Sequence, residues 1–423
     1  MNSLAVWYTG LSGSTQTVVL LATVFTIVFL GYMLGRITIC GLSLGTSGIL
    51  IVSLFFGHYI GKLLTGISQL PVDSSVISSS TSLINNSLKI IEQLGLVCFV
   101  TSVGFIAGPV FFNNFKSNAG SYIVMGVLII LIGACACAAV IKFFGVETDI
   151  AVGLYTGALT STPALSAAKE ALGNNAATGY AIGYPFGVVG VVLFVQLMPK
   201  LLKADIDKEV AKLRVGGAKE ENAKKEGSYF LFEKYGFFPF GIAVTLGLML
   251  GSITINTTGV EFLGFGASGG TRIFSLGATG GSLIVGLVLG YLGHIGPVSL
   301  KIPKTTLNAM RELGLVFFLI GAGVSGGKDF AAKISEYGPV LFLYGAVITL
   351  VPMIVAYIVG RYILKLDMFN YLGSITGGMT STPALGSLIS VAGSDDVAAS
   401  YAATYPVALL LVVLSIQFFA AVF

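Results

Sequence analysis

The strongest constraint on the fold is a series of long apolar stretches that recur along the chain. Each is long enough to cross a bilayer, which takes about 20 apolar residues in a helix. Backbone groups in lipid must find their hydrogen-bond partners within the chain, and helices achieve this. The sequence therefore predicts an all-α integral membrane protein with about ten transmembrane helices. The stretches lie near residues 15 to 35, 42 to 62, 88 to 112, 120 to 143, 178 to 199, 237 to 256, 274 to 296, 306 to 326, 337 to 361 and 397 to 421.

Composition excludes a soluble fold and several classes of function. Hydrophobic residues make up 55% of the 423-residue chain and charged residues 10%, whereas soluble domains carry about 25% charged residues. The formal charge of +4 gives no electrostatic footprint for nucleic acid,. The sequence contains no Walker loop, paired metal ligands or nucleophile and base set, so we predict no enzymatic activity and no cofactor. A coupling ion, Na⁺ or H⁺, is left open.

The two halves of the chain are related in sequence. EQLGLVCF at 92 to 99 recurs as RELGLVFF at 311 to 318, and GALTSTPAL at 157 to 165 returns as GGMTSTPAL at 377 to 385. Because such matches keep one order, they indicate an internal duplication. We therefore divide the chain into a first membrane repeat (1–202), a charged linker (203–234) and a second membrane repeat (235–423).

Basic residues predict the orientation in the membrane, because they stay cytoplasmic in short loops. The Lys-rich linker is therefore expected inside a bacterial inner membrane. Five crossings on either side of it place both termini outside and invert the second repeat relative to the first. This count requires that the segment holding each TSTP motif enters and leaves on one face, as a re-entrant hairpin. A broken helix is the alternative geometry. Inverted repeats of this kind are typical of secondary transporters, whose site lies at the repeat interface.

The TSTP motif of each repeat is the strongest candidate for a binding site. Proline disfavours helix at the preceding residue, so we expect breaks at Thr162 and Thr382, with a new half-helix beginning at each proline. A helix N-terminus presents free N–H groups and partial positive charge, which suit a carboxylate. A packing kink is the alternative, but its repetition in both halves favours a site. The expected substrate-binding residues are Thr160, Ser161, Thr162, Pro163, Thr380, Ser381, Thr382 and Pro383.

Other polar residues within the apolar stretches are weaker candidates. Tyr184 and Tyr405 each precede a proline in the last span of their repeat. Their hydroxyls either face the binding site or pack between helices. Glu92 is expected near the start of a span, with its carboxylate reaching the interface. Lys169 and Glu170 are expected at a solvated end of the first hairpin, where one of them could steer substrate or serve in a gate.

The motifs GALTSTPAL and GGMTSTPAL, with the Tyr-Pro pair that follows each, resemble those of the aspartate:alanine exchanger family. The resemblance covers the whole chain apart from the linker. It implies a secondary transporter, and it suggests a homodimer with an elevator-like moving domain. Many members carry soluble regulatory domains in the central region, where this chain has only a short linker.

These observations together predict a secondary active transporter, by exchange or ion coupling, for a small carboxylate solute such as an acidic amino acid or dicarboxylate. Two alternatives stay open. An anion channel would conduct without saturation and would need a continuous polar lining. A non-transporting sensor or scaffold would need an output domain, which the short linker does not offer.

Overall fold

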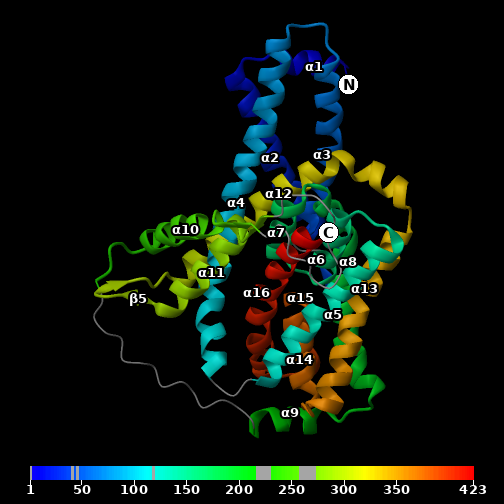
Figure 1. Ribbon diagram of the computed structural model, residues 1–423, viewed down its shortest axis with the longest axis vertical. Coiled ribbons are helices and arrows are strands. Elements are labelled where there is room, and N and C mark those ends of the chain that lie inside the picture. The colour runs from blue at the N-terminus through cyan, green and yellow to red at the C-terminus, as the bar shows by residue number, and fades with distance from the viewer. Residues whose placement is uncertain (1, 40–41, 44–46, 117–119, 216–229, 257–272) are drawn as a thin grey trace.

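The computed structural model describes residues 2–39, 42–43, 47–116, 120–215, 230–256 and 273–423, and it is built almost entirely from helices (Figure 1). Part of the predicted linker, 216–229, lies outside the described residues. Eight of the described helices are long and apolar enough to cross a membrane. The prediction of an all-α integral membrane protein is therefore confirmed.

The first repeat contributes five long helices, preceded by the short α1 (Asn2–Thr9). Their positions follow the predicted apolar stretches, and α4 extends well beyond its own. They are α2 (Gly13–Gly35), α3 (Ser47–Ser68), α4 (Ser74–Lys116), α5 (Gly120–Phe144) and α8 (Asn175–Leu201).

The second repeat has the same order of helices, after the linker helix α9 (Ile206–Val215). Its members are α10 (Phe237–Gly251), α11 (Gly277–Leu292), α12 (Lys304–Tyr337), α13 (Val340–Ile358), which continues as a π-helical turn η1 (Val359–Ile363), and α16 (Ala398–Val422). A 3-10 turn, η2 (Asp395–Val397), precedes α16.

Helices α10 and α11, with 15 and 16 residues, are shorter than the apolar stretches predicted for them. The missing ends form an antiparallel pair of strands, β3 (Thr254–Asn256) and β4 (Ile273–Ser275). The first repeat has a matching pair, β1 (Thr38–Ile39) and β2 (Leu42–Ser43), and a third pair, β5 (His294–Ile295) and β6 (Val298–Ser299), follows α11. Thr and Ile favour extended backbone, which explains why an apolar run leaves the helix there.

The central helices α4 and α12 cross at glycines. A Cβ atom on Gly95 would lie 2.7 Å from the carbonyl oxygen of Gly314, and one on Gly314 would lie 2.7 Å from that of Gly95. Small residues let backbones approach closely where lipid supplies no hydrophobic drive. Helix α3 packs on α12, and α11 packs on α4, so each repeat rests on the central helix of the other.

Candidate functional site

Each TSTP motif lies at the tip of a helical hairpin. In the first repeat α6 (Thr148–Ala158) is followed by α7 (Thr162–Leu172), and in the second α14 (Met368–Gly378) is followed by α15 (Thr382–Ala392). The helix is interrupted at 159–161 and 379–381, directly before the residues where proline predicted it. Each new helix has its proline within the first two positions, where the missing N–H costs nothing,.

The chain reverses direction at both interruptions. Gly179 of α8 lies against Ile150 of α6, and Gly187 lies against Gly157, so these two helices run the same way. Helix α7, which joins them, must therefore run back. In the second repeat Gly373 and Gly377 of α14 contact α16 in the same rising order. The segments are hairpins, and a continuous broken helix does not describe them.

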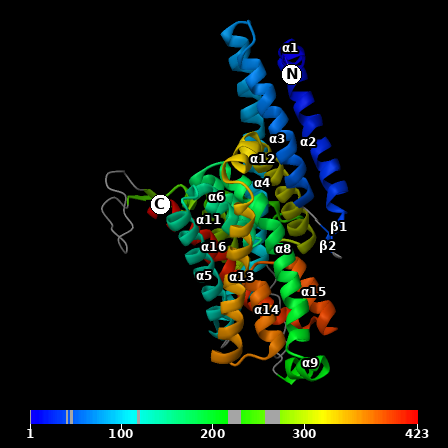
Figure 2. The same ribbon diagram turned by 90° about the vertical axis from the view of Figure 1, so that its right-hand side faces the viewer.

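The two hairpins lie at different heights of the molecule, with α6 near its middle and α14 and α15 below it, toward α9 (Figure 2). At the start of the first, the Glu147 N–H bonds to the Tyr337 hydroxyl at the end of α12, 3.4 Å away. At the start of the second, the Met368 N–H bonds to the Glu209 carboxylate of α9, 3.3 Å away. This arrangement is the one expected of inverted repeats.

The hairpin tips meet, and each donates a hydrogen bond to the other. The Thr160 hydroxyl donates to the carbonyl of Met379 over 3.0 Å, and the Thr380 hydroxyl donates to that of Leu159 over 2.7 Å. Both threonines have left-handed backbone, with φ of 54° and 50°. Two residues predicted as substrate ligands thus use their hydroxyl protons to join the tips.

Ser161 and Ser381 are the N-caps of α7 and α15, and both are buried, with 1% and 0% of their surface exposed. Within the described residues neither hydroxyl has a hydrogen-bond partner. A buried hydroxyl without a partner costs about 1–3 kcal/mol. Each also lies beside the unpaired N–H groups of a first helical turn. These two serines therefore differ from Thr160 and Thr380 of the hairpin tips, whose hydroxyls have hydrogen-bond partners.

The remaining predicted residues lie around the tips but differ between the repeats. The Thr162 hydroxyl is hydrogen-bonded to that of Tyr180 over 3.2 Å, while the side chain of Thr382 lies outside the described part. Pro163 is buried, whereas Pro383 is exposed.

Two tyrosine pairs lie on α8 and α16 next to the tips. The ring of Tyr184 packs at a tilt on that of Tyr180, with ring centroids 5.1 Å apart, and Tyr405 stacks on Tyr401 with centroids 5.3 Å apart. The sequence analysis did not single out Tyr180 and Tyr401. Their spacing of four residues from the Tyr-Pro pair, repeated in both halves, was the available signal.

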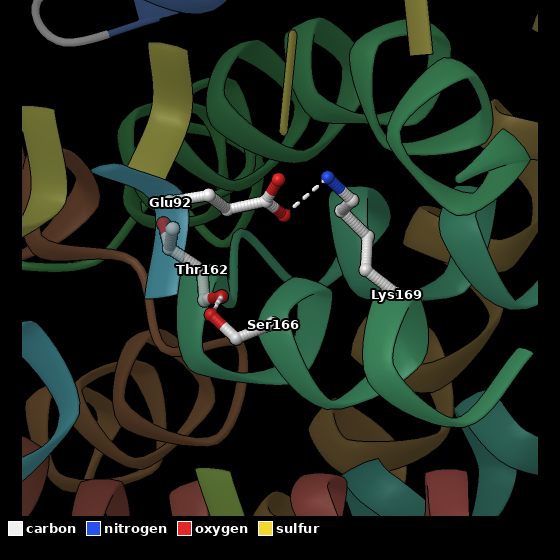
Figure 3. Close-up of polar contacts among 4 residues, drawn as sticks. All are labelled: Glu92, Thr162, Ser166 and Lys169. Atoms are coloured by element: carbon white, nitrogen blue, oxygen red, sulfur yellow. Dashed lines mark hydrogen bonds and ion pairs between the residues drawn. The ribbon is translucent and has the colours of Figure 1, made fainter. Parts of the chain in front are cut away.

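The expectation of a solvated or interfacial position is wrong for Glu92 and Lys169, whereas Glu170 is exposed as expected. Glu92 lies inside α4, because that helix begins at Ser74, and it forms a buried ion pair with Lys169 near the end of α7 (Figure 3). Both residues are only 9% exposed. Glu170 is exposed, yet its carboxylate accepts the N–H groups of Ala278 and, over 3.1 Å, Thr279 at the start of α11.

Comparison with known proteins agrees with the duplicated architecture. A family described as a predicted permease membrane region matches this chain twice, over residues 23–200 and 239–421. The chain belongs to this permease family. The two matched segments leave out the whole charged linker, and each contains one hairpin with its TSTP motif.

Several curated relatives are named as uncharacterized transporters. One from Bacteroides fragilis is 29% identical, with 95% of this chain and 98% of the relative covered. Others come from Rhodopirellula baltica, at 27% identity with 91% and 96% covered, and Desulfotalea psychrophila, at 26% with 91% and 93% covered. The first alignment spans 555 positions against 423 residues here, so that relative contains segments without a counterpart in this chain. These relatives share the description of transporter, and the eight candidate spans make this chain a multi-pass membrane protein.

Proposed function

We propose that this permease is a secondary active transporter for a small carboxylate solute, such as an acidic amino acid or a dicarboxylate, and that the solute binds between the hairpin tips. The observation that carries the proposal is the pair of buried, unpartnered serine hydroxyls, Ser161 and Ser381, at two opposed helix N-termini. Such N-termini attract anions through N–H groups and the helix dipole.

The chemistry of the two tips suits a carboxylate without a basic side chain. Each tip offers a hydroxyl and the N–H groups of a first helical turn, and two tips facing each other supply donors for both oxygens or for two carboxylates. Binding would satisfy the serine hydroxyls, which lack a partner in the described chain. Thr160 and Thr380 would hold the tips together, and Pro163 and Pro383 would fix where the helices begin.

The proposal extends to the organisation of the protein in a bacterial inner membrane. The linker would face the cytoplasm and both termini the outside, and two copies would form a homodimer. Transport would proceed by exchange or with a coupling ion, with the hairpin region moving as an elevator relative to the α4 and α12 region. The family resemblance suggests exchange of an acidic for a neutral amino acid.

Reconstitution tests the proposal. The purified protein in proteoliposomes is loaded with unlabelled solute and given labelled amino acids and dicarboxylates in turn, and counterflow is measured. We expect saturable counterflow of at least one small carboxylate. An anion channel would instead give a conductance that does not saturate, and a sensor or scaffold would give neither signal.

Substitution of the serines locates the site. Ser161→Ala and Ser381→Ala keep a small side chain but remove the hydroxyl, and each should weaken carboxylate binding about tenfold or more, because a hydrogen bond to a charged group contributes about 1.5–3 kcal/mol. Ser12, the N-cap of α2, has its own N–H partner at Thr15 over 3.4 Å. Ser12→Ala is therefore the matched control. Unchanged binding in both hairpin variants would exclude this location.

A further inference from the structure

A polar stripe runs along one face of α7 from the hairpin tip to the buried ion pair (Figure 3). Thr162, Ser166 and Lys169 are spaced by four and three residues, which places them on one side of a helix. The Ser166 hydroxyl donates to the Thr162 carbonyl over 3.2 Å, and the Lys169 ammonium donates to the Glu92 carboxylate. The stripe links the proposed carboxylate site with two opposite charges.

The duplication provides an internal comparison for this stripe. Aligning the two TSTP motifs makes Gly386 the counterpart of Ser166 and Ile389 the counterpart of Lys169. The second hairpin therefore forms the same two helices with an apolar side chain where the first has an ammonium. The fold does not require the charge, and replacing a buried ion pair by apolar residues is often neutral or stabilising.

Glu92 and Lys169 lie on different segments, so the ion pair would be pulled apart if the hairpin moved relative to α4. Glu92 belongs to α4 and lies against α12, since a Cβ atom on Gly321 would be 2.9 Å from its Cγ atom. Lys169 belongs to the hairpin. The pair therefore connects the helix crossing to a segment that would move during transport, and separating two buried charges without compensation is costly.

We propose that the Glu92–Lys169 pair is a proton-binding site that couples carboxylate transport to proton movement. This inference rests on the proposed function. A proton from the aqueous phase binds to a Glu92 carboxylate oxygen, and Lys169 keeps its own proton. The pair is then replaced by a neutral carboxylic acid and an uncompensated ammonium. That positive charge, at the far end of the stripe, offsets the negative charge of the bound carboxylate.

Binding of the proton to Glu92 therefore raises the affinity for the anionic substrate, and bound substrate raises the affinity for the proton. The positive charge that Lys169 then presents and the negative charge of the substrate offset each other. Ionised Glu92 cancels the charge of Lys169, so no positive charge is left to offset the negative charge of an entering anion. Protonated Glu92 leaves the hairpin with a charge that the anion neutralises. Intramembrane ionisable residues commonly mark proton relays for this reason.

Other charged groups on the helices packed around Glu92 already have partners or lie at a distance along the helix. On α4, Lys89 is exposed one turn away, and on α7 Glu170 is bonded to α11. On α12, Arg311 pairs with Glu312 over 2.9 Å, and Lys328 donates to Asn85 over 3.0 Å. On α3, His58 and Lys62 lie beyond Ser53 toward the end of the helix that contacts Lys328.

The experiment measures substrate and proton movement together. Proteoliposomes that contain no substrate and hold a trapped pH-sensitive dye receive labelled L-aspartate or succinate, whichever gives the larger counterflow signal. Net uptake is followed, because one-for-one counterflow moves no net proton. Wild-type protein should move roughly one proton per substrate molecule, since one carboxyl group titrates. Substrate affinity should fall as pH rises, approaching tenfold per pH unit. Glu92→Gln imitates the protonated carboxyl group, so counterflow should persist with affinity independent of pH and no accompanying proton.

Glu170→Gln is the matched control, because it removes the neighbouring carboxylate of the same helix, which accepts hydrogen bonds from the neutral N–H groups of Ala278 and Thr279. Its proton-to-substrate ratio should equal that of the wild type. If Glu92→Gln does not fold, the double variant Glu92→Leu with Lys169→Ile reproduces the apolar side chain of the second hairpin. It should bind substrate at least tenfold more weakly and without pH dependence.

The outcomes separate the two proposals. Wild-type net uptake without proton movement, or proton coupling retained in Glu92→Gln or in the double variant, would overturn the proton site and leave the carboxylate transporter standing. Failure of every carboxylate in the wild-type counterflow panel would instead overturn the proposed function itself.

Discussion

At the residue scale, the hairpin tips depend on two threonines in an unusual conformation. Left-handed backbone is uncommon for a β-branched residue and costs of order 1–3 kcal/mol when it occurs. Thr160 and Thr380 both adopt it, and both donate a hydrogen bond across the tips. The sequence predicts the break, because proline acts locally. It does not predict the sign of φ or the cross-tip partners, because these arise only when residues more than 200 positions apart meet.

Thr160→Val tests the contribution of the cross-tip hydrogen bond. Valine keeps the shape of threonine but leaves the Met379 carbonyl without its donor. We expect the free energy of unfolding to fall by about 1–3 kcal/mol, the cost of an unsatisfied buried acceptor. Unfolding in detergent by titration with sodium dodecyl sulfate measures the loss. Thr160→Ser retains the hydroxyl and should lose less, and equal losses in both variants would contradict a role for the hydrogen bond.

At the element scale, the boundaries of the helices show which signals in the sequence were informative. Long apolar runs located most spans, but the segment of α4 before the predicted start at residue 88 is rich in Ser and Asn and lay outside the predicted span. No Pro or Gly interrupts it between Ser74 and Glu92. In this segment the absence of Pro and Gly was therefore a better predictor of helix than hydrophobicity was. The error hid the ion pair, because a Glu at the start of a span has no need of a buried partner such as Lys169.

The packing of α6 against α8 gives a prediction at this scale. A Cβ atom on Gly183 would lie 2.5 Å from the Leu154 carbonyl oxygen, and backbone cannot shift to make room. Gly183→Ala should therefore separate the two helices and reduce the unfolding free energy by about 1–3 kcal/mol. Gly386 on α15 has open space in the direction of its Cβ. Gly386→Ala should be neutral or slightly stabilising, and similar losses in both variants would refute the packing argument.

At the scale of the whole molecule, helices of each repeat pack against the central helix of the other repeat, α3 on α12 and α11 on α4. The order of elements and the doubled motif allowed this symmetry to be predicted from sequence. The asymmetry was not predicted: the returning helix of the first hairpin, α7, carries charged residues that fasten it, Lys169 to α4 and Glu170 to α11. The corresponding residues of the second hairpin, Ile389 and Ser390, carry no charge. Pairing between α7 and residues about 80 to 110 positions away leaves no local trace in the sequence.

This asymmetry predicts which cross-links stop transport. If the hairpins move relative to α4 and α11, a short thiol-reactive linker between Glu170→Cys and Ala278→Cys should abolish counterflow, and reduction of a disulfide-containing linker should restore it. The Gln196 amide of α8 donates to the Ser387 hydroxyl of α15 over 2.9 Å, and both helices belong to the hairpin region. The same linker between Gln196→Cys and Ser387→Cys, with the native cysteines replaced, should leave counterflow intact because both ends move together. Full transport with the first pair linked would mean that α7 stays on α11 throughout the cycle, so that the elevator movement takes place elsewhere.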